Sequence, residues 1–160
     1  MKLWKRFIKV FLIIFIFFIP LLSSDSIKTK NRVSSVYFEL FGQGPILSIN
    51  YDKHFVDKNI SFRTGLGIFP IYNFYFTFPF GINYLFGKKH MFETNTGITV
   101  FLKMNENKKI ITNDSKVVPT IGLGYRYQSE KDWFFRTGFT YYIGSDKFSI
   151  WPGISAGASF

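Results

Sequence analysis

The sequence has no cysteine, which excludes disulfide bonds, thiol nucleophiles and cysteine-ligated metal sites. It also has only 2 His, and its 10 Asp and Glu are outnumbered by 20 Lys and Arg. The mean hydropathy of +0.10 is too low for a bundle of membrane-spanning helices. Aromatic residues, by contrast, are abundant: they make up 21% of the chain and include 22 Phe. Many aromatic residues in a chain of modest hydropathy are typical of strands with one apolar and one polar face.

The formal net charge of +10 is spread unevenly. Four of the bases (Lys2, Lys5, Arg6 and Lys9) precede the first acid, which leaves 16 bases against 10 acids in the remaining chain. A basic surface can indicate nucleic-acid binding. Here the remaining lysines are scattered through turns and do not gather on one face, so we expect no nucleic-acid partner.

The N-terminal residues have the pattern of an export signal. A basic segment, Met1–Lys9, precedes the uncharged apolar run Val10–Leu22, and small serines follow. We expect a signal peptide over 1–24, cleaved near 24–26, and then a polar tail over 25–33. The apolar run is shorter than a spanning helix requires. The alternative is an uncleaved inner-membrane anchor; a lipoprotein anchor is excluded because no cysteine follows.

Residues 34–160 show no helical period. They contain segments of alternating apolar and polar residues separated by turn residues, which predicts strands. Several segments are as long as a tilted membrane-spanning strand. We therefore predict an all-β fold, an eight-stranded antiparallel up-and-down transmembrane β-barrel. The predicted strands are 34–42, 45–53, 60–70, 74–87, 90–103, 117–128, 132–144 and 147–160.

The predicted connections differ in length. The longest, Met104–Lys116, falls on the same side as the Gly42–Gly44 turn, whereas Gly87–Lys89 and Ser129–Lys131 fall on the other side. Outer-membrane barrels have short periplasmic turns and longer extracellular loops. This pattern places Met104–Lys116 outside the cell.

The two faces of the predicted strands differ in bulk. In 74–87, Phe76, Phe78 and Phe80 alternate with Thr77 and Gly81. The polar face consists of small residues that fit the narrow interior of an eight-stranded barrel, so the bulky apolar face should point to lipid. Nine of the 13 glycines fall on the polar face: Gly65, Gly67, Gly81, Gly97, Gly122, Gly124, Gly138, Gly153 and Gly157.

Tyrosine and tryptophan residues near the strand ends would form girdles at the two membrane interfaces. The alternative is the general preference of aromatic residues for strands. The candidates are Tyr37, Tyr51, Tyr84, Tyr127, Trp133 and Tyr141.

At this point the chain resembles the small eight-stranded outer-membrane barrels of the OmpX-like and OmpA-barrel type. The resemblance covers 34–160 and includes a last strand in which Ile154, Ala156, Ala158 and Phe160 alternate. It implies location in the outer membrane of a Gram-negative-type bacterium, contact with outer-membrane lipid and lipopolysaccharide, and a C-terminal Phe160 read by the assembly machinery. Ala158 and Ser155 depart from the residues usual in that last strand.

Six charged residues fall on the lumen face. Enclosed charges must pair, because an unpaired buried charge costs several kcal/mol. We therefore predict a structural ion network that plugs the lumen; the alternatives are a gated proton or ion path and a narrow pore. The six residues are Glu39, Asp52, Arg63, Glu93, Arg126 and Arg136.

Catalysis is not expected. Barrel enzymes that modify lipid A need His near the outer leaflet to activate a nucleophile, whereas His54 and His90 fall at predicted periplasmic turns. Two His do not make a metal site, and the Gly-x-Gly pairs lie inside strands. We expect no catalytic residue, cofactor or metal, but a monomer with a structural or surface-interaction role. A lipid A-modifying enzyme and a soluble lipocalin-like periplasmic barrel remain alternatives.

Overall fold

The computed structural model describes residues 34–55, 59–71, 73–87, 89–104, 110–129, 131–144 and 149–160, with the backbone alone for 110–114. The predicted signal peptide and polar tail lie outside these residues. In the described part of the chain, no helix is long and apolar enough to cross a membrane.

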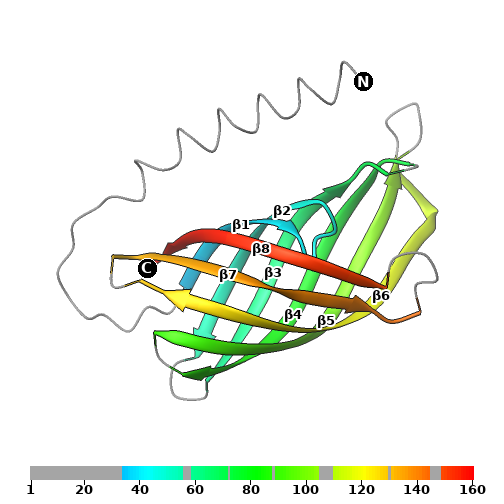
Figure 1. The fold of residues 1–160 in the computed structure, drawn as a ribbon. Coiled ribbons are helices and arrows are strands. Elements are labelled where there is room, and N and C mark those ends of the chain that lie inside the picture. The colour runs from blue at the N-terminus through cyan, green and yellow to red at the C-terminus, as the bar shows by residue number, and fades with distance from the viewer. Residues whose placement is uncertain are drawn as a thin grey trace.

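The described residues form a closed barrel of eight antiparallel strands, in which each strand pairs with the next and β8 pairs with β1 (Figure 1). The predicted fold class is therefore confirmed. At the closure, the Phe160 N–H donates to the Ser34 carbonyl over 2.8 Å. The strands are β1 (Ser34–Phe41), β2 (Leu47–Phe55), β3 (Ile60–Phe69), β4 (Tyr75–Gly87), β5 (His90–Met104), β6 (Ile110–Gln128), β7 (Trp133–Tyr142) and β8 (Ile150–Ser159).

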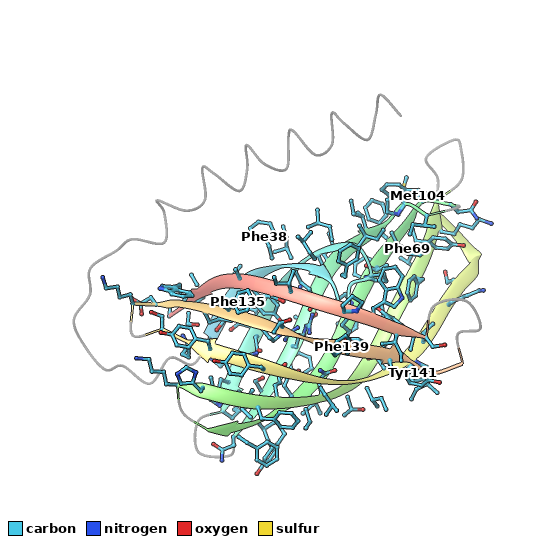
Figure 2. All side chains as sticks on the ribbon, in the orientation of Figure 1. Phe38, Phe69, Met104, Phe135, Phe139 and Tyr141 are labelled. Carbon is cyan, nitrogen blue, oxygen red and sulfur yellow. The ribbon has the colours of Figure 1, made fainter. Side chains whose placement is uncertain are left out.

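The small polar face of each strand points into the barrel and the bulky apolar face points outward, as the alternation predicts. On β4, Thr77 and Asn83 are completely buried, whereas Ile82 and Tyr84 are exposed by 52% and 40% on the outer surface. Figure 2 shows Phe38 projecting away from the barrel wall. The large apolar side chains therefore cover the outside, and the small polar ones fill the lumen.

The predicted loop Met104–Lys116 is wrong over much of its length. β5 continues to Met104, and β6 begins at Ile110, with Lys103 paired to Ile111 and an irregular register between Phe101 and Lys103. The reason is that a hairpin extending beyond the barrel can be polar on both faces. Its residues therefore lack the alternation that identifies a membrane strand.

The predicted position of Tyr37 in an interfacial girdle is also wrong. Its side chain is 1% exposed and lies in the lumen. Successive side chains of a strand alternate between faces, so Tyr37 must share the face of Glu39, two residues further on. The other candidates, Tyr51, Tyr84, Tyr127, Trp133 and Tyr141, lie on the outer face.

Candidate functional site

The six charged residues predicted for the lumen all lie there. Glu39 comes from β1, Asp52 from β2, Arg63 from β3, Glu93 from β5, Arg126 from β6 and Arg136 from β7. None is exposed by more than the 7% of Arg136. Six of the eight strands thus each deliver one charge to the same enclosed space.

These residues form a continuous chain of alternating charges. The Arg63 guanidinium pairs with Glu39, which also accepts from Arg136 over 2.6 Å. Arg136 continues to Glu93 over 3.0 Å, and Glu93 pairs with Arg126 over 2.9 Å.

The chain ends where the second guanidinium nitrogen of Arg126 donates to Asp52 over 2.5 Å. Three cations meet three anions, so the group carries no net charge. Each charge in it has at least one partner of opposite sign, as a buried charge requires.

Asparagine and serine side chains surround the ion chain. Asn50 accepts from the Arg63 Nε over 3.4 Å and donates to the Ser48 hydroxyl over 2.8 Å. Asn83 donates to Asp52 over 3.3 Å and to Ser61 over 2.9 Å. These short side chains thus supply further hydrogen-bond partners to Arg63 and Asp52.

Two aromatic rings lie among the residues of the ion chain, and the sequence did not predict their contacts with the arginines. The Tyr37 ring lies between Arg63 and Arg136, whose guanidinium carbons are 5.5 and 5.2 Å from its centroid. Phe134 is fully buried, lies 5.2 Å from the Arg126 guanidinium and meets Tyr37 edge-on. Cations over ring faces are attracted by the ring quadrupole. Strand alternation could have predicted both positions, since each ring precedes a lumen charge by two residues and so shares its face.

A glycine makes room for these rings. Gly157 on β8 is the register partner of both Tyr37 and Phe134. A Cβ added at Gly157 would collide with the Cβ of Tyr37 and the carbonyl oxygen of Val36. The lumen therefore holds large rings where the facing wall has no side chain.

Buried apolar side chains lie near the Arg126 end of the ion chain. Leu85 and Met91 are exposed by 1% and 6% and lie close to the end of β4 and the start of β5. Met91 is the register partner of Arg126, so this end of the ion chain has apolar neighbours inside the barrel.

The two histidines lie at the same end of the barrel, close to turns. The His90 Nδ1 is 2.6 Å from the Tyr125 hydroxyl on the outer face. His54 has a buried Nε2 without a hydrogen-bond partner. Among the described residues, no group of three or more His, Cys, Asp and Glu is placed to hold a metal ion.

These features define a closed eight-stranded barrel with an apolar outer surface and a charge-paired interior. No known protein family and no curated protein matches the chain. Among solved structures, the N-terminal β-barrel domain of Pseudomonas aeruginosa OprF is similar, with a TM-score of 0.63 and 13% identity. The match covers 82% of this chain and 100% of that domain. At this identity the likeness shows a shared fold and nothing more; the narrower resemblance to OmpX-like barrels stays a prediction.

Proposed function

We propose that this protein is an integral outer-membrane barrel with a closed lumen and a structural or surface-interaction role, without catalytic activity. The observation that carries the proposal is the inversion of its two faces. Phe139, Leu123 and Ile150 are exposed by 63%, 57% and 66%. A soluble protein rarely exposes a continuous apolar surface of this kind, whereas lipid accepts it at no cost.

The outer membrane is favoured over other membranes by the type of barrel. Closed barrels are the strand structures that satisfy every backbone group in lipid, and small closed barrels with an apolar outer face are typical of outer membranes. Outward aromatic residues near strand ends, such as Trp133 and Tyr141, support contact with membrane interfaces. In this proposal Phe160 serves assembly, and the barrel contacts lipid and lipopolysaccharide as a monomer.

The lumen network is proposed to act as a plug. An eight-stranded barrel has an interior just wide enough for side chains to fill. Here the ion chain, its polar neighbours and the apolar side chains of Leu85, Met91 and Phe134 occupy it. In planar-bilayer recordings we expect no stable single-channel conductance; regular unitary currents from the unaltered protein would contradict the plug.

Cell fractionation with heat-modifiable gel migration tests the membrane assignment. We expect recovery in the outer-membrane fraction and a folded band that shifts only after boiling in detergent. Recovery in the soluble periplasmic fraction would overturn the proposal and favour the lipocalin-like alternative.

The proposed absence of catalysis has its own test. The barrel would be incubated with lipopolysaccharide, and the acyl number of lipid A measured by mass spectrometry. We expect no change, since His54 and His90 lie at the end opposite the Gly42–Ile46 turn. A gain or loss of one acyl chain would replace this part of the proposal with an enzyme.

A further inference from the structure

The turn between β1 and β2 folds into the lumen. Gln43 at its centre is only 1% exposed, although connecting segments usually lie on the surface. Its Nε2 donates to the Phe80 carbonyl on β4 and to the Thr120 hydroxyl on β6, each over 3.0 Å. The side chain therefore reaches across the barrel to the opposite wall.

The backbone of the same turn is held from two further strands. The Gln43 carbonyl accepts from the Thr99 hydroxyl on β5 over 3.0 Å. It also accepts from the Tyr142 hydroxyl on β7 over 2.8 Å, and this hydroxyl lies at the same distance from the Gly42 carbonyl. Side chains and backbone of four strands thus hold one short turn inside the barrel.

Glycines create the space that the turn occupies. A Cβ at Gly97 would lie 2.7 Å from the Gln43 Nε2, and a Cβ at Gly81 would lie 3.2 Å from it. Gly42 has a φ of +75°, which favours glycine, and a Cβ there would meet the Glu39 carboxylate at 2.6 Å. Three glycines, in the turn itself, on β4 and on β5, therefore leave the space in which the turn lies.

A small polar cavity lies beneath the turn. Gly42 lines it together with Thr140, Asn95 and three members of the ion chain, Glu39, Glu93 and Arg136. The buried Asn95 Oδ1 has no hydrogen-bond partner. An unpartnered buried oxygen beside charged groups is what ordered water satisfies in protein interiors.

Aromatic rings cover the turn from the other side. The rings of Phe69 on β3 and Trp151 on β8 lie 6.1 Å apart, although β1 and β2 separate these strands in the sheet. They must therefore meet over the short β1–β2 turn, at the barrel end where Figure 2 shows Phe69. Phe41 stacks on Trp151 at 6.0 Å and completes the cover.

We propose that the β1–β2 turn is a lid that separates the polar cavity of the lumen from solvent. Backbone hydrogen bonds hold the base of the turn, from the Phe41 N–H to the Ile46 carbonyl and from the Gly42 N–H to the Pro152 carbonyl. Its tip at Gln43 is fastened by side-chain hydrogen bonds, so the tip can withdraw while β1 and β2 stay in the sheet. When it withdraws, water and small ions reach the Glu39–Arg136–Glu93 part of the ion chain from that end. The state of this turn then controls access to an otherwise closed lumen.

The absence of cysteine allows a direct test on the purified barrel in detergent. Thr140→Cys, 5% exposed, would place a thiol in the cavity wall, and a small charged thiol reagent would report its access to water. In the unaltered lid we expect slow labelling. Gln43→Ala removes two hydrogen bonds of the closed lid, so labelling should become roughly tenfold faster. Tyr142→Phe, a milder change, should act in the same direction.

Ser159→Cys is the matched control reporter. It is 2% exposed at the opposite end of the barrel, and its labelling should not respond to Gln43→Ala or Tyr142→Phe. Equal labelling of Thr140→Cys with and without the lid changes would overturn the lid, whether both rates are slow or both fast. Heat-modifiable migration of each variant reports the folded barrel separately, so failure of the lid and failure of the proposed membrane barrel give different results.

Discussion

On β7, Phe139 and Arg136 stand three residues apart and face opposite surroundings. Phe139 is 63% exposed on the outer surface, whereas Arg136 is 7% exposed and pairs with both Glu39 and Glu93. In the proposed membrane, any apolar side chain of similar size can take the place of Phe139 against lipid. Arg136 is far less replaceable, because its planar guanidinium offers fixed donors in two directions and so bridges two carboxylates.

The outer face and the lumen limit the choice of residues in different ways. In the proposed membrane, lipid requires the outer face to be apolar but does not require particular side-chain shapes. The lumen requires residues of a particular polarity, shape and charge at each position, because each group must meet a particular partner. Substitutions on the two faces should therefore differ in their effect on stability.

Arg136→Leu should be the most damaging single change. It leaves Glu39 with Arg63 alone and Glu93 with Arg126 alone, although both carboxylates stay buried. Loss of one partner of a buried ion pair costs about 3–5 kcal/mol. Reversible urea unfolding in lipid vesicles measures this cost. Phe139→Leu on the same strand is the matched control; equal effects of the two changes would show that the ion chain contributes no stability.

A charge placed on the outer face should lower the stability of the barrel more, the closer it lies to the centre of the proposed bilayer. For Leu123→Arg, near the middle of the part of β6 that pairs with β7, we expect about 2–4 kcal/mol of destabilisation if the face meets the centre of the bilayer. For Trp133→Arg, at the start of β7, the same principle predicts about 0–1 kcal/mol. The comparison is made by unfolding in the same vesicles. A negligible cost at Leu123 would mean that this face does not contact hydrocarbon.

Gly157→Ala should destabilise the barrel although it adds a single methyl group. The added Cβ would collide with the Val36 carbonyl and the Tyr37 Cβ, so β1 and β8 must move apart. Overpacking of this kind typically costs about 1–3 kcal/mol. Gly144→Ala provides a contrast, because no atom lies within 4 Å of the added Cβ, although its φ of +79° adds backbone strain. Unfolding midpoints compare the two; a larger loss at Gly144 would show that strand packing at Gly157 is loose.

The smallest effect is expected for apolar exchange on the outside. Ile121→Val and Phe139→Leu keep the outer face apolar, and lipid fills the space that they leave. Each should change the free energy of unfolding by no more than about 0.5 kcal/mol, as for ordinary surface substitutions. A loss near that of Arg136→Leu would contradict the difference between the two faces.

Much of the architecture could be predicted from the sequence, because alternation is a direct consequence of strand geometry. The same parity that placed Arg63 and Arg136 inside also applies to Tyr37 and Phe134. The size of both rings, however, argues against a place in a narrow lumen. Their fit depends on Gly157, which becomes their neighbour only through the register of β8 with β1 and β7.

Other features depend on contacts that a single strand does not reveal. The ion pairs join strands across the lumen. Neighbouring residues in the sequence therefore do not indicate which guanidinium meets which carboxylate. The inward fold of Gln43 depends on Gly81, Gly97 and Tyr142, which lie 38 to 99 residues away along the chain. The sequence predicts a loop beyond Phe101 because the polar residues there do not alternate with apolar ones.

The order of charges along the ion chain also bears on how the barrel assembles. Asp52 on β2 pairs with Arg126 on β6, and Glu39 on β1, which pairs with Arg63 on β3, has its second partner in Arg136 on β7. Until β6 and β7 are in place, Asp52 therefore lacks its cation and Glu39 lacks one of its two. In the proposed membrane this opposes entry of the first strands ahead of the others and favours insertion as one concerted step at closure.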